Sequence, residues 1–384
     1  MSILPDGRYV DDAPYSPDED VSLAEHPEYD APNWILIWRR FRKHRLGLVS
    51  GLFLFIAYVL LPFVGFIAPY TAKERNANHI YAPPQSVSLF HQGEFIGPHV
   101  YPTVATADLT TFRWTYKEDA SRPIKLEFFC DAGEHKFLGL IKTTKHLFCA
   151  PGDGTVFLWG SDRLGRDMFS RILYGAQLSL TVGLIGISVS FLLGIGFGSL
   201  AGYFGGKVDW SIQRVIEVLR SLPELPLWLA LSAAVPAHWG PVAVFFIISI
   251  ILGLLDWPGL ARAVRAKFLS LREEDYVRAA EMMGAPPSRV IKRHLLPNFS
   301  SHLIASAMLS IPAMILGETA LSFLGLGLRA PAVSWGVMLN DAQNLAAIEI
   351  YPWTAIPMIP IILVVLAFNF LGDGLRDSLD PYQS

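Results

Sequence analysis

Long stretches without a charged residue constrain this chain more than any other feature of its sequence. Residues 46–72, 172–206 and 225–255 contain no Asp, Glu, Lys or Arg, and about 20 apolar residues in a helix are enough to cross a bilayer. Charged residues make up 17% of the chain, against about 25% in typical soluble domains. The sequence therefore predicts an all-α integral membrane protein and excludes a disordered, collagen-like or disulfide-rich small protein.

Six transmembrane helices account for the apolar segments. The turn at residues 236–241, which begins and ends with proline, separates the third span from the fourth. The third span is expected to include charged residues at its start. The six expected spans lie near residues 46–72, 178–202, 212–235, 242–260, 303–328 and 353–372.

Cationic residues predict the orientation of these spans. Five cations directly precede the first span, and eight more lie between the fourth and fifth spans, within residues 261–297. Because short cytoplasmic loops are enriched in Lys and Arg, both clusters are expected in the cytoplasm, together with both termini. The opposite orientation would place all of these cations outside.

The spans divide the chain into four regions. Residues 1–33 are expected to be a disordered acidic cytoplasmic tail, because residues 1–30 hold nine acids, one base and four prolines. Residues 34–72 form an interfacial segment and the first transmembrane helix. Residues 73–171 form an extracytoplasmic insert and a pre-helix segment, and residues 172–384 form the helical core with a cytoplasmic loop at 261–297.

The insert is expected to be small and rich in β-structure. Apolar and aromatic runs at residues 111–116, 124–129 and 136–141 are separated by Gly and Pro, which is typical of short strands. Cys130 and Cys149 both lie in the insert, where an oxidising compartment would favour a disulfide between them. Two separate core thiols are the alternative.

Several residues within the spans are candidates for helix packing or for a polar network. Gly194, Gly198 and Gly202 recur every four residues, a spacing that lets another helix approach closely, in this chain or in a partner. Ionisable groups at membrane depth must face protein or water. Those of the third span, spaced three, three and four residues apart, are expected to form an ion-pair ladder; an alternative is that the ladder moves when a pathway opens. With one acid of the fifth span, the set is Arg214, Glu217, Arg220, Glu224 and Glu318.

The loop at residues 261–297 carries the clearest pattern. Tyr276, Ala279, Ala280 and Met283 share one face of a predicted helix that Gly284 and the following Pro-Pro terminate. A second short helix is expected at residues 289–295, ended by Pro297. An interfacial amphipathic linker is one interpretation, but a docking site for another protein better explains the small residues beside a sharp break.

This loop resembles the coupling loop of ABC importer permeases. The matching residues are Arg278-Ala-Ala-Glu-Met-Met-Gly284, then nine residues, then His294-Leu-Leu-Pro297, with Arg278 and His294 in place of the family's Glu and Ile. The C-type permeases of the dipeptide, oligopeptide and nickel branch are similar at four further stretches: residues 38–45, 160–167, 321–327 and 368–381.

The resemblance implies a function and a set of partners. Tyr276, Ala279, Ala280, Met283, Gly284 and Pro297 would couple the permease to a cytoplasmic ATPase. The partners would be a second, B-type permease, two P-loop ATPases and a periplasmic solute-binding protein, in the bacterial inner membrane. The chain itself would hold no cofactor and no metal, and the ATPases would bind ATP and Mg²⁺. Di- or oligopeptides are the first expectation for the solute, with oligosaccharides, opines and nickel chelates as alternatives.

Other functional classes lack their motifs here. The sequence contains no His-Glu-x-x-His, no Gly-x-Ser-x-Gly and no P-loop, so neither an intramembrane hydrolase nor an ATPase is indicated. The net charge of −3 gives no basic field for nucleic acid. A solitary secondary transporter or channel is the remaining alternative. Trp228, Trp239, Trp257 and Trp335 could stack on sugars, although membrane tryptophans are more often interfacial anchors.

Overall fold

The structure is a computed structural model and describes residues 2–3, 9–10, 33–108, 113–137, 141–152, 154–236 and 238–379. Almost all of the predicted acidic tail lies outside these residues, apart from the paired strands β1 (Ser2–Ile3) and β2 (Tyr9–Val10). The described part begins with the amphipathic helix α2 (Asn33–Lys43), which carries Arg40, Arg42 and Lys43 in its last turn and packs near α14 (Met358–Leu379).

Among the described residues, five helical stretches are long and apolar enough to cross a membrane. The first combines α3 (Arg45–Leu60), the 3-10 turn η1 (Leu61–Phe63) and α4 (Val64–Ile67), and it ends where Ala68 turns extended before Pro69. The others match four more of the expected spans: α5 (Met168–Phe204), α8 (Pro241–Leu271), the stretch Pro287–Phe323 that contains α11 (Leu296–Phe323), and the stretch Pro352–Leu379 formed by η3 (Pro352–Ala355) and α14.

The expected third span is divided in two. Helix α6 (Gly206–Ser221) is separated by Leu222 and Pro223 from the short apolar helix α7 (Glu224–Ala233), and neither is long enough to be counted with the five. The break follows from Pro223, since a residue before proline is pushed out of the helical region. Leu222 accordingly has φ −96° and ψ 138°. The apolar composition alone did not indicate this interruption.

Antiparallel strands make up much of residues 88–149. Three strands pair in the order β3 (Ser88–His91), β4 (Glu94–Val100) and β7 (Ile124–Lys125). Two further hairpins pair β5 (Thr103–Asp108) with β6 (Arg113–Glu118), and β8 (Glu127–Phe137) with β9 (Ile141–Cys149). The run at 136–141 includes the end of β8 and the start of β9, where Phe137 pairs with Ile141, and residues 138–140 lie outside the described residues.

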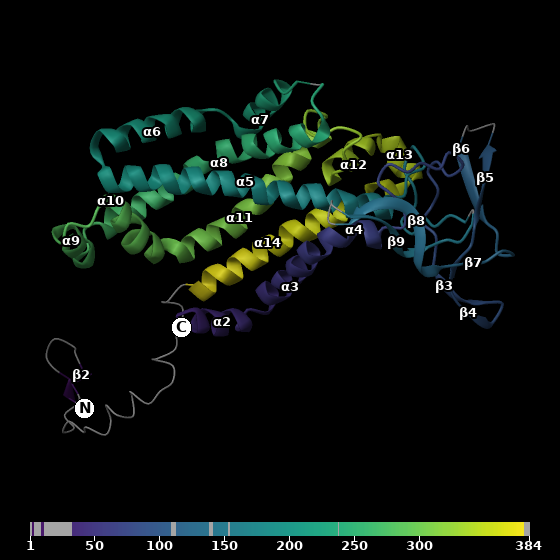
Figure 1. Ribbon diagram of the computed structural model, residues 1–384, viewed down its shortest axis with the longest axis horizontal. Coiled ribbons are helices and arrows are strands. Elements are labelled where there is room, and N and C mark those ends of the chain that lie inside the picture. The colour runs from purple at the N-terminus through teal and green to yellow at the C-terminus, as the bar shows by residue number, and fades with distance from the viewer. Residues whose placement is uncertain are drawn as a thin grey trace.

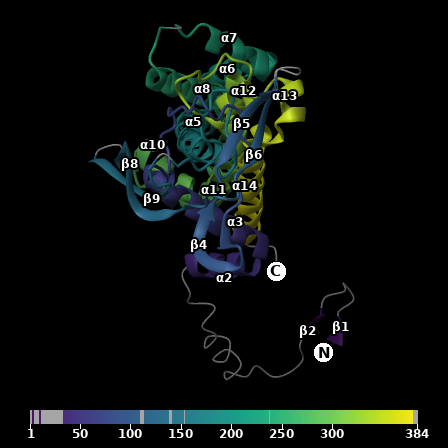
Figure 2. The same cartoon turned by 90° about the vertical axis from the view of Figure 1, so that its right-hand side faces the viewer.

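The long helices run side by side, with strands β3 to β9 gathered at one end of the bundle (Figure 1, Figure 2). The short helix α9 (Asp275–Met282) lies at the opposite end, beyond the C-terminal end of α8. The helices α12 (Trp335–Asp341) and α13 (Leu345–Ile350) lie beside the strand-bearing end. The core between the helices contains Leu180 of α5, Ile315 of α11 and Phe368 of α14.

A seam of glycines brings α5 and α8 into close contact. A Cβ atom added at Gly194 would lie 2.9 Å from the Cβ of Leu260, and one at Gly198 would lie 2.7 Å from the carbonyl oxygen of Ala261. One at Gly202 would lie 2.6 Å from the Cβ of Phe268. All three glycines therefore face a neighbour within the chain, which is one of the two alternatives that their spacing left open.

This seam gives a stability prediction with an internal control. Gly198→Ala should lower the free energy of unfolding by about 1–3 kcal/mol, because the added methyl group has to push α8 away. Gly196→Ala lies on the same helix with no atom within 4 Å of its added Cβ, so it should leave stability unchanged or slightly raised. Thermal unfolding of both variants in detergent tests the prediction, and equal stabilities would contradict it.

Candidate coupling surface and polar clusters

Helix α9 presents a small apolar surface to the outside of the molecule. Met282 is 90% exposed and Met283 81% exposed, and Tyr276 and Ala279 are also exposed. The opposite side of the helix is packed, since Val277 and Ala280 are buried. Val277 belongs to a cluster with Phe268 and Val290. Exposed methionines at the end of a bundle form an adaptable apolar contact site, here called the α9 surface (Tyr276, Ala279, Met282 and Met283).

The sequence-based assignment of this face needs one correction. Ala280 was expected to contact a partner, but it is only 3% exposed and faces the bundle. Met282, which was not singled out, is the most exposed of the large apolar side chains of α9. The face is rotated relative to the expected one because Val277 packs into the cluster formed with Phe268 and Leu271 of α8, so the side of α9 that carries Val277 and Ala280 is buried.

Polar contacts fix α9 against its surroundings. Asn298 donates a hydrogen bond from Nδ2 to the Tyr276 hydroxyl at 2.8 Å, which ties α9 to the start of α11. The Tyr203 hydroxyl, at the end of α5, donates to Oε1 of Glu281 at 2.8 Å. Arg278 pairs with Glu273 at 2.5 Å. The helix is therefore positioned by residues of three different segments.

The end of α9 depends on Gly284. Its φ is +78°, in the left-handed region that glycine adopts without strain, and the amide of Ala285 donates to the carbonyl of Ala280 at 3.1 Å. No atom lies within 4 Å of a Cβ added there. A larger residue at this position would therefore be strained by the left-handed backbone conformation and would not clash with a neighbouring atom.

The segment after Gly284 differs from the expected one. Helix α10 (Pro287–Arg289) continues through a π-helical turn, η2 (Val290–Leu295), directly into α11. Pro297, expected to stop the helix, is the second residue of α11. In this wider turn the amide of Leu296 reaches the carbonyl of Ile291. The turn accommodates Pro297 at a position where, inside a regular α-helix, the proline ring would clash with a carbonyl of the preceding turn.

The expected ion-pair ladder of the third span does not form as one unit. Arg214 and Glu217 pair at 2.6 Å on the exposed side of α6. Arg220 and Glu224 lie on either side of the break at Pro223 and line a shared pocket next to Leu255 of α8. The interruption separates residues that a continuous helix would have stacked.

Glu318 lies in the core of the bundle and is fully buried. Its Oε1 accepts hydrogen bonds from Ser322 at 2.6 Å and from Ser334 at 2.8 Å. Ser334 also caps α12, because its hydroxyl accepts the amide of Val337. Glu318 therefore links α11 to the segment that leads into α12, and its partners come from positions 4 and 16 residues away.

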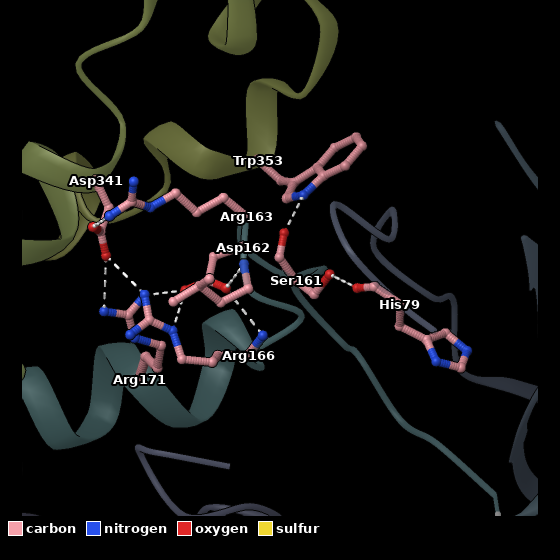
Figure 3. Close-up of polar contacts among 9 residues, drawn as sticks. His79, Ser161, Asp162, Arg163, Arg166, Arg171, Asp341 and Trp353 are labelled. Carbon is pink, nitrogen blue, oxygen red and sulfur yellow. Dashed lines mark hydrogen bonds and ion pairs between the residues drawn. The ribbon is translucent and has the colours of Figure 1, made fainter. Parts of the chain in front are cut away.

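A buried ion cluster joins the segment before α5 to α12 (Figure 3). Arg166 contacts Asp162 at 2.6 Å and Asp341 at 2.9 Å, and Arg171 contacts the same two carboxylates. Arg163 contacts the other oxygen of Asp341 at 3.0 Å. The side chains of Arg166 and Arg171 are 8% and 2% exposed. The sequence reasoning noted residues 160–167 as a motif but did not identify this cluster, because Asp341 is distant in sequence.

Asp167 lies next to this cluster as the N-cap of α5. Its Oδ2 accepts the amide and the hydroxyl of Ser170, at 2.7 and 2.6 Å. Burial raises the pKa of Asp167 to about 7, although the Ser170 hydrogen bonds act in the opposite direction. Between about pH 4 and pH 7 the native state therefore keeps Asp167 protonated, whereas the unfolded chain, in which the pKa of an Asp is about 3.9, has released this proton.

This shift predicts a pH dependence of stability. A raised carboxyl pKa contributes stability below about pH 4, and the contribution is lost as the pH rises to about 7, on the order of 4 kcal/mol in all. Asp167→Asn keeps an oxygen acceptor for the cap and has no proton to lose. Thermal unfolding at pH 5 and pH 8 should therefore show a smaller difference in the variant, whereas an equal difference would show that Asp167 does not titrate in this range.

The two cysteines of the insert form a disulfide in the structure, with their Cα atoms 6.3 Å apart. Cys149 ends β9, and Cys130 lies in β8 opposite His146. Within the described residues, no group of three or more His, Cys, Asp or Glu side chains could hold a metal ion. Of the four tryptophans considered for sugar stacking, Trp257 and Trp335 are buried, Trp228 is partly buried, and Trp239 is exposed.

Comparisons with known proteins give a consistent result. Residues 194–383 match the family model described as the binding-protein-dependent transport system inner membrane component. Residues 33–84 match the N-terminal TM domain of oligopeptide transport permease C. A dipeptide transport system permease protein of Bacillus subtilis is 42% identical over 58% of this chain and 68% of its own length. Its counterpart in Lactococcus lactis subsp. cremoris is 31% identical over 90% of both chains.

Among solved structures, the inward-facing MetNI methionine ABC transporter matches 56% of this chain and 98% of its own chain. The TM-score is 0.44 and the sequence identity 17%.

Proposed function

The chain belongs to the peptide-permease branch of the binding-protein-dependent inner-membrane transport components, and we propose that it forms one half of a pathway that imports di- or oligopeptides. It is a multi-pass membrane permease subunit. Oligosaccharides, opines or nickel chelates are the alternative solutes. The observation that carries the proposal is the α9 surface, an exposed apolar patch at one end of a bundle whose other end bears the insert (Figure 1).

We infer the orientation from the distribution of cations. Arg289, Lys292 and Arg293 are exposed next to α9, and the basic turn of α2 lies in front of the first span. The positive-inside tendency places this end in the cytoplasm, with both termini. The insert then faces the periplasm, where its Cys130–Cys149 disulfide is compatible with an oxidising environment. Helices α6 and α7 together would supply a sixth, interrupted crossing.

The proposed partners follow from this arrangement. Two P-loop ATPases would bind ATP and Mg²⁺ in the cytoplasm, one of them receiving the α9 surface in a groove. A second, B-type permease would complete the pathway, and a periplasmic binding protein would deliver the solute to the insert side. ATP-driven closure of the ATPases would move α9 and, through its contacts with Asn298 and Tyr203, the ends of α11 and α5. The pathway would thereby alternate between outward and inward access.

One glycine variant tests this coupling role. Gly284→Leu should lower ATP-dependent peptide uptake at least about tenfold while the complex still hydrolyses ATP, because a left-handed position costs a non-glycine residue on the order of 1 kcal/mol or more and displaces the end of α9. Uptake and hydrolysis are measured together in proteoliposomes that contain the complete complex.

A matched control separates coupling from general strain. Gly206 also has a positive φ, +52°, with no atom within 4 Å of an added Cβ, but it begins α6 and has no part in the α9 surface. Gly206→Leu should leave the ratio of uptake to hydrolysis unchanged. Normal uptake with Gly284→Leu, or equal losses in both variants, would remove α9 from the mechanism.

A further inference from the structure

A pocket of about 280 Å³ lies between the α7–α8 turn and the segment that follows α11. It lies at the N-terminal end of α8, whereas α9 follows the C-terminal end of that helix. Because α8 has 31 residues and therefore extends about 46 Å, the pocket and the α9 surface are at opposite ends of the bundle. In the orientation proposed above it faces the periplasm, so it is called the outer pocket here. Its apolar walls include Val235, Pro236, Trp239, Val244, Leu326 and Pro331.

One wall of the outer pocket is held rigidly. The amides of Leu326 and Gly327 both donate to the carbonyl of Leu321, at 3.0 and 2.8 Å. The amide of Leu328 donates to the Ser322 hydroxyl oxygen at 2.9 Å, and the same hydroxyl donates to buried Glu318. The opposite wall is joined to this one through Ser232, whose hydroxyl donates to the carbonyl of Leu326 at 2.5 Å. The pocket is thus formed before any ligand arrives.

Arg329 is the only charged residue among the described lining residues. Its Nε donates to the carbonyl of Gly325 at 2.8 Å, which fixes the base of the guanidinium. Within the described residues, no ion pair joins this guanidinium to a carboxylate. A fixed cation beside apolar walls is suited to a ligand with an anionic group attached to an apolar body.

We propose that the outer pocket binds the C-terminal end of a peptide as it enters the pathway, with Arg329 paired to the terminal carboxylate and Trp239 against the last side chain. This inference rests on the function proposed above and adds a recognition site to it. A guanidinium matches a carboxylate with two parallel hydrogen bonds. The Arg329 side chain is exposed, so a carboxylate can reach its guanidinium from the solvent.

The test compares a peptide with its amide. Trialanine and trialanine amide differ at the group that Arg329 would contact. Their ATP-dependent uptake is measured with the complete complex, including the binding protein, in proteoliposomes. Arg329→Gln should lower the acid-to-amide uptake ratio about tenfold, the value expected for loss of one charge-assisted pair, with amide uptake unchanged. Arg329→Lys should keep part of the preference, and Arg122→Gln, an exposed change in the insert, should keep all of it.

Each other outcome overturns the proposal. Equal losses for acid and amide would show a structural role for Arg329, and unchanged uptake of both would place the pocket off the pathway. Loss of the second permease from the purified complex would show that Arg329 lies in a subunit interface. A lipid phosphate could also bind the cation, in which case adding phosphatidylglycerol would change uptake of both peptides by wild type and not by Arg329→Gln. A wild-type complex without any ATP-dependent uptake would instead refute the proposed function itself.

Discussion

Met282→Glu should reduce ATP-dependent uptake by about 100-fold or more and should prevent the ATPases from copurifying with the permease. Met282 is 90% exposed in the isolated chain, so the change should have little effect on the stability of the permease itself. In the assembled importer its side chain would lie in an apolar contact, and an unpaired carboxylate buried there costs about 3–5 kcal/mol, which corresponds to about 100–4,000-fold weaker association. Uptake assays and quantitative mass spectrometry of the purified complex measure the two effects.

The control for this prediction is another change from an exposed apolar residue to Glu, at the other end of the molecule. Leu89 of β3 is also an exposed apolar residue, at 47%, and lies in the insert. Leu89→Glu should leave both uptake and ATPase association at the wild-type level. If Met282→Glu kept its ATPases and its uptake, the α9 surface would not be the site of coupling.

The second large effect is expected at the buried ion cluster. Asp341→Ala should lower the free energy of unfolding by about 3–5 kcal/mol, because Arg166 and Arg171 would then share only Asp162 and one buried cation would lack a partner. The exposed side chain of Arg163 can adjust, whereas Arg171 is 2% exposed and cannot reach water. Thermal unfolding in detergent and the yield of folded protein report this loss.

A surface ion pair supplies the comparison. Asp131 contacts Lys145 at 2.7 Å in the insert, and both side chains are more than half exposed. Asp131→Ala should therefore leave the unfolding temperature of the whole protein close to that of the wild type. Similar losses for Asp341→Ala and Asp131→Ala would mean that burial adds nothing to the cluster.

The helical class and most of the spans were predictable because uncharged runs of the required length have few other stable structures. The division of the third span was not predicted, because the argument from apolar composition did not consider how Pro223 restricts the backbone of Leu222. Pro297, by contrast, was expected to end a helix and does not. A proline normally ends a helix, but here a π-helical turn before it lets the helix continue into α11.

The candidate site was predictable in location and not in detail. The apolar spacing of residues 276–283 and the glycine that follows located this helix, which the structure has at Asp275–Met282. The direction of its face depended on what packs beneath it, which is why Ala280 is buried and Met282, to which no role was assigned, is exposed. The ion cluster depends on a contact between Arg166 and Asp341, 175 residues apart. Neither charge pattern nor periodicity connects two such residues.

The measurement that tests the central claim most directly is purification of tagged protein from its native membrane in mild detergent, followed by quantitative mass spectrometry of the associated proteins. The account predicts a second multi-span permease and one or two P-loop ATPases in amounts comparable to the tagged chain. It also predicts that Met282→Glu removes the ATPases and keeps the second permease. A homo-oligomer without an ATPase, under conditions that keep other membrane complexes intact, would contradict the account and favour a solitary transporter.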